Sequence, residues 1–211
     1  MLRITPLKVP SLIILIALIA AIAKRDTASN PKMDYERWLS AGNHEKAVSA
    51  YAGFLRSHGV EGVLPMQELL SASRDWRQCG VDPWTLPPAS AWPAMVPTLK
   101  LLQRLRQSGL TTGARVTSSY RNVDLNRCAG GKPASKHLAN AALDLRLSPA
   151  SAASEHEALC GFWRRHGREY RMGLGLYRSG QVHIDTQGYR QWDPRLAPGV
   201  PPCRDAPAGR P

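Results

Sequence analysis

The chain has 211 residues, and 28 lysines and arginines against 16 aspartates and glutamates give it a formal net charge of +12 at pH 7. Its length suits one domain with additional segments, and 43% hydrophobic residues exclude a chain that is disordered throughout. Only one stretch is continuously apolar, which excludes a polytopic membrane protein. The positive charge predicts an anionic partner, and nucleic acid, a membrane surface and an acidic polymer such as a cell wall all fit.

Residues 1–25 form a segment with its own role. Basic residues precede and follow an unbroken apolar run over residues 12–23. A helix of that length spans about 18 Å, less than the ~30 Å hydrocarbon core of a bilayer. The pattern therefore predicts a signal peptide, or an uncleaved signal anchor, because Lys24 is an awkward residue directly after a cleavage site. Either way we expect an exported protein of the periplasm or cell envelope, which touches the membrane only through this segment.

Residues 26–97 are predicted to form a helical and proline-rich N-terminal region. Apolar residues recur at helical spacing over 33–58, which indicates one or two amphipathic helices broken near residues 42–43. A second helical stretch is expected over 65–76. Five prolines over 81–97 then predict an extended connection.

After this region the sequence changes to a helix followed by short strand-like runs. Residues 95–107 predict a helix that turns four leucines toward a core and stops at Gly109. The whole pattern predicts an α+β fold, with a small, mostly antiparallel sheet and flanking helices. We expect the core domain to cover 98–192 and a loosely ordered, proline-rich tail to cover 193–211. The expected elements are strands at 114–118 and 141–147, a helix at 149–170, and a hairpin of 173–177 and 181–186 around Ser179 and Gly180.

The four cysteines fit export. None lies in a CxxC pair, so a cysteine-based metal site is not expected. In an oxidising compartment the cysteines predict two disulfides in any of three connectivities, with buried free thiols as the alternative. The four are Cys79, Cys128, Cys160 and Cys203.

Two histidines and an aspartate in the second half suggest a metal centre. His137 precedes a predicted strand that contains Asp144, and burying that carboxylate between leucines is costly unless a cation compensates it. His183 and Asp185 are two residues apart on another predicted strand, so both project from one face. Two His and one Asp are a familiar ligand set for catalytic zinc. Asp185 is then a candidate general base, or a group that orients a ligand.

Several motifs surround these residues. They are SSYR at 118–121, Asn126, SKHLANAALD at 135–144, GLGLY at 173–177, HID at 183–185 and RQW at 190–192. Together they resemble the peptidase M15 family of zinc D-Ala-D-Ala carboxypeptidases and peptidoglycan D,D-endopeptidases. The resemblance covers 116–192 and implies a Hedgehog/D-Ala-D-Ala peptidase-like fold. It also implies that Zn2+ is held by His137, Asp144 and His183.

The same resemblance implies roles for other residues. Arg121 matches an arginine that binds substrate or stabilises a developing oxyanion; a structural salt bridge to Asp124 or a neighbouring residue is the alternative. Asp185 is the expected general base, and the remaining predicted site residues would bind substrate or support the ligands. These are Tyr120, Ser135 and Trp192.

Three positions depart from the family pattern. Ser119 stands at the glycine of S-G-Y-R, and Asn140 stands where the family usually has glycine. Many family members carry an acidic base three residues before the last histidine, and this chain has Gly180 there. That absence leaves Asp185 as the expected base.

The predicted function is a zinc-dependent peptidase that hydrolyses D,D-peptide bonds of peptidoglycan stem peptides. A catalytically silent module that binds the cell wall is the alternative. Nucleic acid is not an expected partner, because the basic residues are scattered and only Arg164, Arg165 and Arg168 form a local group.

Overall fold

The computed structural model describes residues 31–177, 179–193 and 203, and the chain divides into two units, residues 1–38 and 39–211. The predicted export segment 1–25 lies outside the described residues. So does the predicted tail, apart from Asp193 and Cys203. Within the described ranges, no helix is both long enough and apolar enough to cross a bilayer.

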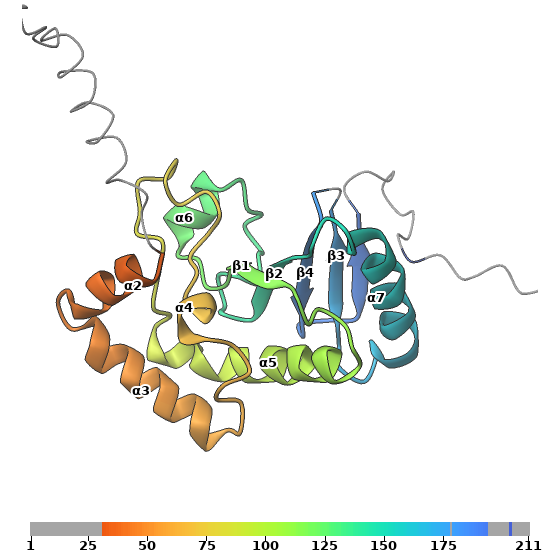
Figure 1. Ribbon diagram of the computed structural model, residues 1–211, viewed down its shortest axis with the longest axis horizontal. Helices are drawn as coiled ribbons and strands as arrows, with labels where there is room; N and C mark the ends of the chain where they lie inside the picture. Colours follow the sequence, from red (N-terminus) through yellow and green to blue (C-terminus); the bar gives the residue numbers. More distant parts are fainter. Residues whose placement is uncertain (1–30, 178, 194–202, 204–211) are drawn as a thin grey trace, which may run out of the picture. The chain divides into compact units, whose positions relative to one another are not determined.

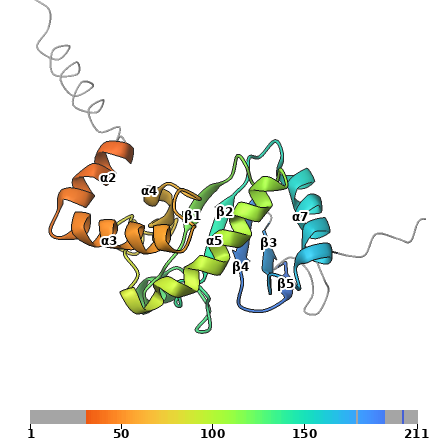
Figure 2. The same cartoon turned by 90° about the horizontal axis from the view of Figure 1, so that it is seen from below.

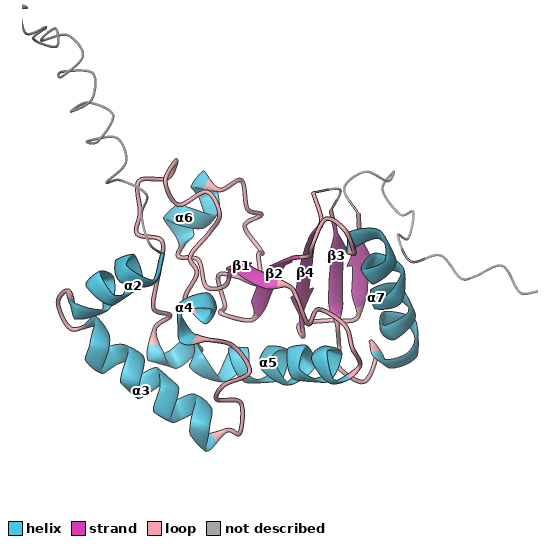
Figure 3. Cartoon of the chain, in the orientation of Figure 1, coloured by secondary structure: helices cyan, strands magenta, loops and turns pink. Residues whose placement is uncertain are grey.

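A five-stranded sheet forms the centre of the second unit (Figure 1). Its order is β1-β2-β4-β3-β5, and every neighbouring pair is antiparallel except β3 and β5. The α+β prediction, with a mostly antiparallel sheet and a β3–β4 hairpin, is therefore confirmed (Figure 3). The parallel edge strand β5 is an addition that the sequence did not predict. The strands are β1 Arg115–Ser118, β2 Ala142–Arg146, β3 Gly173–Leu176, β4 Gln181–Asp185 and β5 Arg190–Trp192.

The central strands divide their residues between two faces. Leu143 and Leu145 of β2 alternate with Asp144, and Val182 and Ile184 of β4 alternate with polar residues. These four apolar side chains are fully buried. Because neighbours on a strand point to opposite faces, one face of the sheet is core and the other carries the polar groups.

Helix α5 (Trp92–Gln107) lies along the sheet, with α7 (Ala152–His166) beside it (Figure 2). The four predicted leucines of α5 are completely buried. The helix begins at residue 92 rather than 95, so the prediction of an extended chain up to residue 97 is wrong. Pro93 fits the first helical turn, where an N–H has no partner in the helix. Pro97 lies within the helix, where leucine burial outweighs one lost hydrogen bond.

The helices before the sheet follow the prediction only in part. Helices α2 (Pro31–Ser40) and α3 (His44–Ser57) are separated where the break is expected. The stretch 65–76 is helical only over α4 (Met66–Leu69), because the backbone that follows pairs with other loops, as in the bond from Ala72 N to Pro83 O. The short helices η1 (Ala89–Ala91) and α6 (Val123–Cys128) were not predicted, and α7 is shorter than expected.

Helix α3 supports the loop that precedes β2. The Tyr51 side chain is fully buried, and its hydroxyl accepts a hydrogen bond from Asn140 Nδ2 at 3.4 Å. Asn140 also donates to the Ala91 carbonyl and adopts a left-handed backbone (φ 53°), which asparagine tolerates better than most residues. The asparagine therefore meets the conformational demand that glycine meets in the family pattern, and it also links the loop to α3.

All four cysteines form disulfides, which selects one of the three possible connectivities. Cys79 pairs with Cys128 and joins a loop to the end of α6. Cys160 pairs with Cys203 and fastens that tail residue to α7. The alternative of buried free thiols is thereby excluded.

Candidate metal centre

The three predicted metal ligands lie together on the polar face of the sheet. Asp144 on β2 and His183 on β4 are direct cross-strand partners, and His137 reaches them from the loop before β2. Asp144 Oδ1 lies 3.0 Å from His183 Nδ1 and 3.2 Å from His137 Nε2. The two histidine nitrogens are 3.2 Å apart. Three atoms able to bind a metal thus converge on one point.

The second nitrogen of each histidine ring is held by the protein. His137 Nδ1 lies 2.5 Å from the Ser119 carbonyl oxygen, and His183 Nε2 lies 3.0 Å from Asp185 Oδ2. An oxygen without a proton can only accept, so each of these nitrogens is the donor. The opposite ring nitrogens, which face the cluster, therefore keep their lone pairs for a ligand bond.

Asp185 is buried completely and is occupied on both oxygens. Arg190 donates from Nη1 to Oδ1 at 3.0 Å and from Nη2 to Oδ2 at 2.6 Å. The Gln187 backbone N–H donates to Oδ1 at 2.8 Å. Together with the bond from His183, these contacts fix the carboxylate in one orientation. Arg190 had no predicted role of its own, although the R-x-W motif contains it.

Two glycines of β3 make these contacts possible. Strand β3 separates β5 from β4, yet Arg190 of β5 reaches Asp185 of β4 across it. A Cβ on Gly173 would lie 2.3 Å from Asp185 Oδ2, and a Cβ on Gly175 would lie 2.5 Å from the Trp192 ring. Side chains from the edge strand therefore occupy the space that glycine leaves free.

The Arg121 side chain lies beside the cluster and not on the open surface of the protein. Its Nη2 pairs with Asp144 Oδ2, and its Nε donates to Ser118 Oγ at 2.7 Å. Asp124 pairs with Arg127 at 3.2 Å, so the ion pair that Arg121 forms is with Asp144 and not with Asp124. The guanidinium group thus lies next to one of the three ligands.

The other predicted site residues surround the cluster at different depths. Tyr120 and Ser135 are half-buried in the flanking loops, and neither side chain makes a hydrogen bond with the described residues. The Trp192 ring centroid lies 5.1 Å from that of His183. Its Nε1 donates to the Tyr177 hydroxyl at 3.1 Å. Tyr177 was not among the predicted site residues, although the G-x-G-x-Y motif ends with it.

Burial and mutual contacts shift the pKa values of all three cluster residues. Burial alone would raise the pKa of Asp144, but the charges and hydrogen bonds of His137 and His183 outweigh it and keep that pKa well below its usual value. Burial lowers the pKa of His137. Burial alone would lower the pKa of His183, but the hydrogen bonds that its ring makes to Asp144 and Asp185 outweigh burial and raise that pKa.

These residues fit a zinc ion by their chemistry. Two imidazoles and one carboxylate are the donor types that zinc binds, and three protein ligands leave one position for water or substrate. The two supporting contacts, from a backbone carbonyl and a carboxylate, are typical of histidines that bind zinc.

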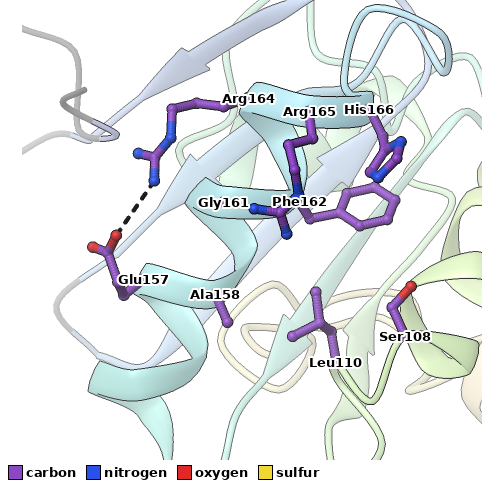
Figure 4. Close-up of a pocket in the computed structure, with 9 residues that line it drawn as sticks. All are labelled: Ser108, Leu110, Glu157, Ala158, Gly161, Phe162, Arg164, Arg165 and His166. Atoms are coloured by element: carbon purple, nitrogen blue, oxygen red, sulfur yellow. Dashed lines mark hydrogen bonds and ion pairs between the residues drawn. The ribbon is translucent and has the colours of Figure 1, made fainter. Parts of the chain in front are cut away.

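A separate pocket of about 420 Å³ lies on α7, and no residue of the metal cluster lines it (Figure 4). Phe162 and Arg165 project into it, and Arg164 pairs with Glu157 along its side. Its basic side chains include two members of the local basic group in the sequence. The pocket adds nothing to the chemistry of the cluster.

The sequence profile of the peptidase M15 family matches residues 63–185, which is more than half of the chain. That range contains His137, Asp144 and His183. It ends before β5, so Arg190 and Trp192 lie outside it. Comparison with curated proteins and with solved structures finds no match.

Proposed function

This chain belongs to the peptidase M15 family of zinc metallopeptidases, and we propose that it hydrolyses D,D-peptide bonds in peptidoglycan stem peptides. The observation that carries the proposal is the convergence of His137 Nε2, Asp144 Oδ1 and His183 Nδ1 within 3.2 Å of one another. The supporting contacts to both histidines add to it, because a simple buried hydrogen-bond cluster does not require them.

Several residues of the chain would have distinct roles around the ion. Bound zinc would supply a Lewis acid that polarises the peptide carbonyl and activates water. Arg121, a permanently charged fork of donors beside Asp144, is suited to bind the substrate or the developing oxyanion. Of the two roles predicted for Asp185, its contacts support orientation of His183. Trp192 would form a wall of the site, and Tyr120 and Ser135 would border it.

The substrate class and location are supported indirectly. The net charge of +12 suits an acidic wall polymer. Two disulfides suit an oxidising compartment, which supports export to the periplasm or cell envelope.

Digestion of purified muropeptides by the wild type and by His183→Ala, read by mass spectrometry, tests the proposal. We expect the wild type to bind one zinc ion and to cleave, and the variant to do neither. Product masses distinguish loss of a terminal D-alanine from opening of a cross-link. Unchanged cleavage by the variant would refute the site.

The alternative of a silent wall-binding module predicts a different result. Such a module would sediment with purified peptidoglycan and bind zinc fully, but it would release no product. Asp185 is already held by four donors, and a metal-bound but inactive protein would be consistent with this alternative.

A further inference from the structure

The register of the sheet arranges the polar face in rows. Gly175 of β3 is opposite His183, which in turn is opposite Asp144, so the cluster occupies one row. Tyr177 follows β3, and its backbone N–H bonds to the Gln181 carbonyl at 3.0 Å. It therefore lies in the next row on the same face, about 7 Å along the strand from the row of His183.

The rows of residues on the two sides of the cluster differ in how their polar groups are bonded within the protein. On one side, the Arg190 side chain is 37% exposed, but both of its Nη atoms are bonded to the buried carboxylate of Asp185. On the other side, Gln181 accepts from Arg74, whose side chain is 53% exposed. Tyr177 is half-buried in this second row. The row of Tyr177 thus places a half-buried hydroxyl group beside the cluster.

The Tyr177 hydroxyl is held in place without using its own proton. Trp192 Nε1 donates to its oxygen at 3.1 Å, and the Trp192 ring lies against His183. In the part of the chain that the structure describes, the hydroxyl donates no hydrogen bond of its own. Burial raises the pKa of Tyr177, so the phenol stays protonated at neutral pH. The result is a fixed neutral donor at the edge of the cluster.

We propose that Tyr177 is a catalytic residue, whose hydroxyl donates a hydrogen bond to the carbonyl oxygen of the peptide bond being cleaved. This inference rests on the proposed peptidase function. The oxygen gains negative charge as the tetrahedral intermediate forms, and a donor fixed beforehand stabilises that charge more than it stabilises the ground state. Trp192 then acts as a positioning residue, because its indole holds the phenol.

The variant Tyr177→Phe removes only the hydroxyl. We expect kcat on purified muropeptides to fall by about 100-fold, as for loss of one oxyanion donor, with KM nearly unchanged. A phosphinate analogue of the cleaved dipeptide, whose charged oxygen imitates the oxyanion, should bind correspondingly more weakly. Zinc affinity, measured by chelator competition, and the melting temperature should stay at wild-type values.

Tyr189→Phe is the matched control. Tyr189 stacks on Trp163 at 4.1 Å, and its hydroxyl makes no hydrogen bond with the described residues, so we expect its kinetics to equal those of the wild type. If Tyr177→Phe hydrolyses muropeptides and binds the phosphinate like a cleaving wild type, this inference alone is overturned. A wild type that neither cleaves muropeptides nor binds the phosphinate overturns the proposed function together with it.

Discussion

His183 Nε2 lies 3.0 Å from Asp185 Oδ2, and this carboxylate is completely buried and fixed by Arg190. The contact sets which nitrogen of His183 carries the proton, and so leaves Nδ1 free to bind a metal. It connects the edge strand of the sheet to the metal cluster.

Asp185→Asn should therefore weaken zinc binding. We expect the zinc dissociation constant to rise by about 10- to 100-fold, the usual cost of losing a group that orients a ligand. Competition with a chromogenic chelator measures it. A general base would give another result, namely unchanged zinc affinity with a large loss of kcat. That outcome would restore the other predicted role.

Gly175→Ala should destabilise the fold, because the new Cβ would lie 2.5 Å from the Trp192 ring. We expect the free energy of unfolding to fall by about 1–3 kcal/mol, as in other overpacked sites, measured by urea denaturation. Gly53→Ala is the control. Its Cβ would meet nothing within 4 Å in the middle of α3, where alanine should stabilise the helix by about 0.5–1 kcal/mol. Equal effects of both substitutions would contradict the role of glycine in β3.

Replacing Cys79 and Cys128 by serine should lower stability without changing the fold. The bridge closes a loop with a sequence separation of 49 residues. Loop-closure entropy then predicts a loss of about 4 kcal/mol in the free energy of unfolding. Denaturation with and without a reductant measures this loss. Reductant should lower the free energy of unfolding of the wild type more than that of this variant. Equal losses in the two proteins would argue against the Cys79–Cys128 disulfide.

Stability at high pH should depend on Tyr51. Burial raises the pKa of Tyr51 to about 12 from 10.0, so the folded protein holds the phenol proton more tightly than the unfolded chain does. The resulting stability is complete below pH 10 and declines as the pH rises toward 12. Between pH 9 and pH 11 the wild type should lose about 1 kcal/mol more than Tyr51→Phe. If urea denaturation showed the same change in the free energy of unfolding with pH for both proteins, this expectation would be contradicted.

The sequence by itself determined the α+β class and the β3–β4 hairpin, and it singled out the three candidate metal ligands. Alternating leucines around Asp144, and the spacing of His183 and Asp185, are local patterns that a strand converts directly into faces. The burial of the α5 leucines could be predicted equally well, because their helical spacing alone places them in the core.

Only the tertiary structure decided which groups support the ligands. The Ser119 carbonyl that holds His137 is a backbone atom, which no side-chain pattern reveals. Arg190 lies on a strand that pairs in parallel with β3, and its reach across Gly173 depends on that pairing. Pro93 fits the first turn of α5, whereas Pro97 lies inside the helix, where packing of the leucines overrides the local preference of proline. Local patterns selected the candidate metal ligands, and long-range pairing fixed how they are held.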